Sequence, residues 1–78
     1  MTQEKIKRVL LETIREELLK RGYSVTSWSR ANGFNAGEVI KCLHRYAVKP
    51  QFPRSPEVYA ILAAIYRDSG VNLMKKVS

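Results

Sequence analysis

Three observations predict an all-α fold of four to five helices for this chain of 78 residues. Apolar residues recur at three- and four-residue steps, the spacing of one helix face, and no stretch shows the apolar-polar alternation of a half-buried strand. Capping residues and glycines stand at the ends of these stretches. The length suits a single domain, residues 1–78, with a small helical core and no cleft between domains.

The first helix is expected over residues 2–21, with Thr2 as N-cap, and Gly22 ends it because glycine tolerates the left-handed C′ position. Its apolar positions are sufficient to cover the core of a small domain: Ile6, Val9, Leu10, Ile14 and Leu18. Leu11 and Leu19 are left without an intramolecular role. They share one face, which is the candidate for contact with a second copy.

Two short helices joined by a tight turn, a helix-turn-helix, are expected at about 25–46. Gly33 is the turn residue because the turn requires positive φ, which glycine adopts without a Cβ penalty. Apolar residues on both sides of the turn are expected to pack together: Trp28, Phe34, Val39, Cys42 and Leu43. Ser24 or Thr26 is placed to cap the first of these helices, and Asn35 is placed to cap the second.

The fourth helix is expected over residues 56–69, and Gly70 ends it. Ser55 precedes it as N-cap, and its core face is Val58, Ile61, Leu62 and Ile65. The preceding loop contains two prolines, with Phe52 as a candidate anchor. Residues 71–78 either add one short turn through Leu73 or fray as a basic tail.

The charge of the chain is concentrated in its middle. The formal net charge is +7, and residues 20–54 carry seven basic side chains against Glu38 alone. Residues 1–19 are balanced, with four basic and four acidic side chains. A basic excess on and beside a helix-turn-helix indicates a polyanion partner, because phosphate contacts release condensed counterions. A soluble basic surface without a specific partner is the plainer alternative.

The outward face of the helix after Gly33 supplies the candidates for reading DNA bases in the major groove. These are Ala36, Gly37, Ile40, Lys41 and His44. Ile40 either meets a thymine methyl or is an ordinary exposed aliphatic residue. Asn35 is expected to cap the helix, which removes its side chain from base reading. The flanking candidates for phosphate contact are Lys20, Arg21, Thr26, Arg30, Arg45, Lys49 and Arg54.

The residue inventory argues against an enzyme. His44 is the single histidine, and it points about 200° around the helix from Cys42, so the two form a poor dyad. No zinc spacing or phosphate-binding glycine loop occurs, so neither a metal site, a cofactor nor a small-molecule ligand is expected. Cys42 is expected in the core. One cysteine, no membrane span and no signal peptide predict a cytoplasmic protein. Binding to DNA would make it nucleoid-associated in a bacterial host.

Three segments carry a resemblance to a known group: the run from Trp28 to Phe34, the positions Val39 and Leu43, and the helix from Pro56 to Leu62. They resemble the small helix-turn-helix DNA-binding proteins of Mu-like phages and prophages, the Ner-like regulators or a neighbouring phage-associated group. The resemblance implies a repressor-like bundle and a phage or prophage transcriptional regulator, most simply a repressor. Its expected partners are double-stranded DNA and, at least on DNA, a second copy of the chain.

Two other functions fit parts of the pattern. A helical protein-interaction module of phage origin would use the exposed leucines of the first helix, and its basic surface would be incidental. A structured-RNA binder would share the charge, but the chain lacks the exposed aromatics that usually stack unpaired bases. Salt-dependent binding to random DNA separates the DNA-binding protein from the interaction module.

Overall fold

The computed structural model describes residues 3–49 and 51–74, without the side chains of residues 3, 4 and 6. In this part of the chain the fold is all-α, with four helices and no strand. The helices are α1 (Gln3–Lys20), α2 (Val25–Ala31), α3 (Ala36–Val48) and α4 (Pro56–Ser69).

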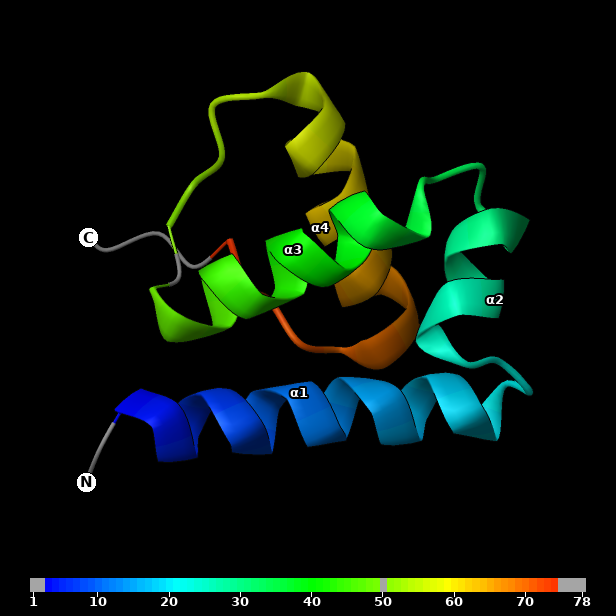
Figure 1. Cartoon of the computed structure of the whole chain (residues 1–78), viewed down its shortest axis with the longest axis horizontal. Helices are drawn as coiled ribbons and strands as arrows, with labels where there is room; N and C mark the ends of the chain where they lie inside the picture. The colour runs from blue at the N-terminus through cyan, green and yellow to red at the C-terminus, as the bar shows by residue number, and fades with distance from the viewer. Residues whose placement is uncertain (1–2, 50, 75–78) are drawn as a thin grey trace.

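The helices surround one apolar core. In Figure 1, α1 runs along one side of α3, α2 stands at the end of this pair, and α4 passes behind α3. All four helices contribute fully buried side chains, among them Ile14, Trp28, Val39 and Leu62. The chain after α4 turns back to the bundle, where Leu73 is also buried.

Local signals set the ends of the helices. The side chains of Ser24, Asn35 and Ser55 accept hydrogen bonds from backbone N–H groups in the first turns of α2, α3 and α4. Gly33, between α2 and α3, has a φ of 77°. Gly70 ends α4 in the left-handed conformation. The expected helix bounds agree with the observed bounds to within two residues.

Several expectations about side chains were wrong. Val9 is 56% exposed instead of buried. Leu11, expected to have no intramolecular role, packs against the core. The Phe52 ring is not a buried anchor, since it is exposed and lies against Tyr59 with 5.7 Å between ring centroids. For residues 71–74 a short turn and a frayed tail were both left open; the chain forms no helix there, and Leu73 is buried.

Three expectations fall on parts of the chain outside the described residues. These are the cap at Thr2, the core position of the Ile6 side chain, and the tail from residue 75 to residue 78.

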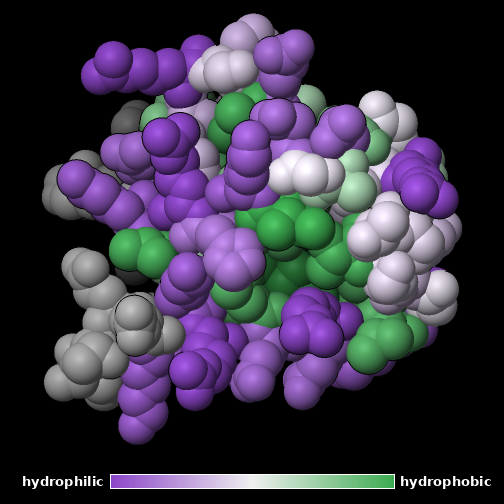
Figure 2. Space-filling model, in the orientation of Figure 1, coloured by the Kyte–Doolittle hydropathy of each residue, from purple (hydrophilic) through white to green (hydrophobic). Residues whose placement is uncertain are grey.

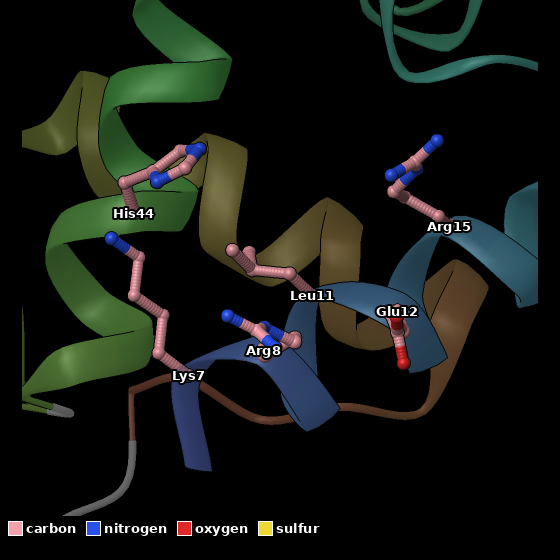
Figure 3. A pocket seen from close by; sticks show the side chains of 6 residues that line it. All are labelled: Lys7, Arg8, Leu11, Glu12, Arg15 and His44. Atoms are coloured by element: carbon pink, nitrogen blue, oxygen red, sulfur yellow. The ribbon is translucent and has the colours of Figure 1, made fainter. Parts of the chain in front are cut away.

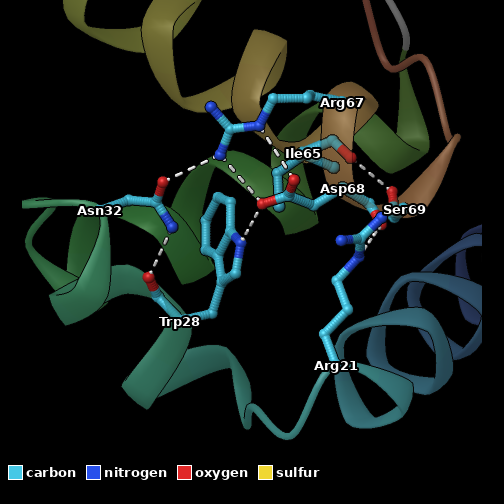
Figure 4. Close-up of polar contacts among 7 residues, drawn as sticks. All are labelled: Arg21, Trp28, Asn32, Ile65, Arg67, Asp68 and Ser69. Atoms are coloured by element: carbon cyan, nitrogen blue, oxygen red, sulfur yellow. Dashed lines mark hydrogen bonds and ion pairs between the residues drawn. The ribbon is translucent and has the colours of Figure 1, made fainter.

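A polar network joins α2 to the end of α4 (Figure 4). The Trp28 side chain is fully buried, and its Nε1–H donates to Oδ2 of Asp68 at 2.8 Å. Arg67 donates both to Asp68 and, at 3.0 Å, to Oδ1 of Asn32. Arg21, after α1, donates from Nε to the backbone oxygen of Asp68 at 2.9 Å. Asp68 therefore links the ends of α1, α2 and α4.

We expect Asp68→Ala to lower the free energy of unfolding near neutral pH by about 1–3 kcal/mol, because the buried indole N–H loses its acceptor. The hydrogen bond from Arg67 lowers the pKa of Asp68 most; burial opposes it, and the bond from Trp28 adds to the lowering, so that the pKa is about 2. Since this lies below the ordinary value of 3.8, the carboxylate stabilises the fold above about pH 4 and loses this effect toward about pH 2.

Denaturant unfolding at a series of pH values measures this difference. The gap between the parent and Asp68→Ala is expected to shrink as the pH falls through this range. Glu16→Ala, which removes an exposed carboxylate from α1, is the control and is expected to change stability by less than about 0.5 kcal/mol. A gap that stays constant down to pH 2 would contradict the role given to the Asp68 charge.

Gly33→Val is expected to destabilise the fold by about 1–2 kcal/mol, because a β-branched residue is strained at positive φ. The Cβ itself has room, since it would meet no heavy atom within 4 Å. Gly33→Asn is the matched control, because asparagine tolerates this conformation better. Thermal melting compares the three proteins, and equal melting temperatures for the valine and asparagine variants would refute the conformational argument.

Candidate nucleic-acid interface

The exposed surface of α3 holds most of the expected base-reading residues in two neighbouring rows. Val39, Cys42 and Leu43 are buried and fix the orientation of the helix. One outward row contains the half-buried Ala36 and the exposed Ile40 and His44; the next contains the exposed Gly37, Lys41 and Arg45. The helix thus presents the expected base-reading residues together on one side.

The first row borders α1. His44 lines an open depression of about 490 Å³ whose other lining residues all belong to α1 (Figure 3). They are Lys7, Arg8, Leu11, Glu12 and Arg15. Counted over the described side chains, three cations against one carboxylate make this depression basic. These α1 cations are absent from the residues expected from sequence, although their separations of one, seven and eight residues place them on adjoining parts of one helix surface.

The second row borders α4. Lys41 and Arg45 line a depression of about 440 Å³ together with Glu38, Cys42, Tyr46 and Val58. Cys42 is only 6% exposed, and burial first, then the nearby Glu38, raises the pKa of its thiol. The thiol is therefore protonated at neutral pH and acts as a small core side chain, as expected from sequence.

The expected phosphate contacts are dispersed around α3. Thr26 and Arg30 are exposed on α2, and Lys49 and Arg54 are exposed in the chain between α3 and α4. Two of the residues expected to contact phosphate already have partners within the protein. The Lys20 ammonium lies 3.0 Å from Glu17, and Arg21 donates to Asp68 as described above.

Most of the basic side chains beside α3 lack an acidic partner. Two ion pairs join side chains that the structure describes, Lys20 with Glu17 and Arg67 with Asp68. The cations of the two depressions, namely Lys7, Arg8, Arg15, Lys41 and Arg45, take part in neither pair. Their charge is not neutralised within the described structure, and an anionic ligand would supply the missing partner.

The same residues were compared with the requirements of a metal site, a membrane span and a Cys-His pair. Nowhere in the described part of the chain do three His, Cys, Asp or Glu side chains gather so as to hold a metal ion. None of the described helices has the length and apolar character needed to span a bilayer. Cys42 is buried and His44 is exposed, so the two do not share a surface site.

Comparison with known proteins gives no relative from which a function can be transferred. No protein-family model, curated protein or solved structure matches the chain. The inference of function therefore depends on the surface itself.

Proposed function

We propose that the chain is a sequence-specific, double-stranded DNA-binding transcriptional regulator of a phage or prophage, most simply a repressor. The observation that carries this proposal is the exposed surface of α3, which holds Lys41 and Arg45 and lies beside the α1 cations. None of these cations takes part in the ion pairs described above. In this proposal α2, the turn at Gly33 and α3 form a helix-turn-helix, with α3 as the recognition helix.

The residues of α3 suit base reading. Lys41 is exposed and can donate to guanine O6 and N7, and His44 lies three residues further along the helix. Ile40 is 42% exposed, so its aliphatic side chain is accessible to a thymine methyl. Asn35 caps α3 by accepting from the backbone N–H of Glu38 at 3.1 Å, so we exclude its side chain from base reading.

The cations around α3 suit phosphate contacts, which orient a protein on DNA without reading sequence. Lys7, Arg8 and Arg15 would hold the backbone on the α1 side of the recognition helix. Arg45 and the exposed Lys49 would hold it on the other side. Two copies of the chain on neighbouring half-sites, about 34–36 Å apart, would double these contacts.

Lys41→Ala and His44→Ala are each expected to weaken binding to a selected operator more than binding to random duplex, by about 1–3 kcal/mol of discrimination. Binding-site selection from random duplexes supplies the operator, and equilibrium binding at matched salt measures both affinities. Lys49→Ala is the matched control, since loss of a phosphate contact should weaken binding to both duplexes alike. If both α3 variants retain the discrimination of the parent, α3 is not the recognition helix.

Replacing Lys7, Arg8 and Arg15 together with glutamine is expected to reduce the salt dependence of binding to random duplex. Each lost phosphate contact lowers the slope of log affinity against log salt by about 0.9, so the triple variant should lose about 2–3. Lys20→Gln is the control, because its ammonium already contacts Glu17. An unchanged slope in the triple variant would show that DNA does not reach α1.

A further inference from the structure

An apolar hollow lies between α1 and α3, beside the basic depression. It has a volume of about 290 Å³ and is lined by Leu11, Arg15, Val25, Ile40, Leu43 and His44. Figure 2 shows a recessed hydrophobic area near the middle of the face, with hydrophilic side chains to its left and below it. Leu11, Arg15 and His44 line both the hollow and the basic depression, so the two are continuous.

We call this continuous feature the α1–α3 groove. Its apolar floor is Leu11, Val25, Ile40 and Leu43, and its basic rim is Lys7, Arg8, Arg15 and His44. Among the described side chains, Glu12 is the one carboxylate that lines it. A ligand that fills this groove needs apolar groups for the floor and negative charges for the rim.

We propose that the α1–α3 groove binds an acidic amphipathic segment of a partner protein. Leucine- or phenylalanine-like side chains of the segment would enter the floor, and its aspartates and glutamates would face the rim. The part of this proposal that concerns competition with DNA depends on the proposed function, whereas the binding of the segment does not.

Charge and polarity favour this occupant over two others. A second copy of the chain carries a net charge of +7 and the same basic rim, so like charges would oppose self-association here. The phosphates of DNA can pair with the cations of the rim. For the apolar floor, however, DNA offers only the thymine methyl groups. An acidic segment with apolar side chains satisfies both parts at once.

The groove shares Ile40 and His44 with the base-reading surface, and Arg15 with the proposed phosphate contacts. A segment seated in the groove therefore covers part of the surface proposed for DNA. Binding of the two ligands is mutually exclusive, and an acidic partner protein would release the regulator from its operator.

Selection of random peptides displayed on phage against the full chain, without DNA, tests the binding. We expect enrichment of peptides with Asp and Glu on one helix face and Leu or Phe at three- and four-residue spacing on the other. A synthetic copy of the best peptide then gives a dissociation constant by fluorescence anisotropy. Polyglutamate of equal charge, which lacks apolar groups, is expected to bind at least about tenfold more weakly.

Two acidic substitutions on the protein locate the binding site. Ile40→Asp places a negative charge on the apolar floor and is expected to weaken binding of the peptide at least about tenfold. Val9→Asp makes the same change of charge at an exposed valine that does not line the groove, and should leave affinity within about twofold. Thermal melting of both variants verifies that they fold. Arg15→Glu is a second test of the site: it reverses a charge of the basic rim at an exposed side chain and should also weaken binding of the peptide.

Three outcomes would overturn the proposal. They are failure to enrich peptides, equal binding of polyglutamate and the peptide, and peptide binding that neither Ile40→Asp nor Arg15→Glu affects. The peptide is finally titrated into a complex with labelled random duplex, which it should displace. Peptide binding without any DNA binding would refute the proposed function alone, whereas DNA binding without peptide binding would refute the groove alone.

Discussion

The hydrogen bond between the buried Trp28 indole and Asp68 is the contact on which the arrangement of the helices depends. A buried N–H without an acceptor lowers the stability of the fold. The tryptophan can therefore fill the core between α2 and α4 only because the Asp68 carboxylate lies within hydrogen-bond distance of its indole N–H. The bonds of Arg67 to Asn32 and of Arg21 to the Asp68 backbone secure the same region. One residue near the end of α4 thereby helps to hold the short helix α2, which also packs against α3.

The orientation of α3 follows from this anchor. The Trp28 ring lies 5.8 Å from the Phe34 ring across the turn, so the direction in which the chain enters α3 is set by the core. Val39 and Leu43 then bury one side of α3 against the bundle. The opposite side is left for solvent, and there the exposed Ile40, Lys41 and His44 are presented by a rigid scaffold.

Sequence predicted the helices well because the signals that end them are local. A serine cap, a glycine with positive φ and the spacing of apolar residues act within one or two turns, and each was visible in the chain. The contacts of α1 were not predictable in this way. Whether Val9 or Leu11 is buried depends on where α3 packs against α1, and that depends on residues distant in sequence. The partner of Trp28 is 40 positions away and left no local pattern.

The basic side of α1 was not predicted from sequence for the same reason, since it too depends on how α1 packs against α3. Counted along the chain, residues 1–19 have no net charge, and contact with a polyanion was expected only from the middle segment. Packing α1 against α3 places Lys7, Arg8 and Arg15 beside His44 and joins them to an apolar floor. The two parts of that surface respond differently to salt, because counterion release governs phosphate contacts while apolar burial is insensitive to screening. If both proposals hold, rising ionic strength therefore weakens the binding of DNA more than the binding of an amphipathic segment. The balance between the two ligands shifts toward the protein partner.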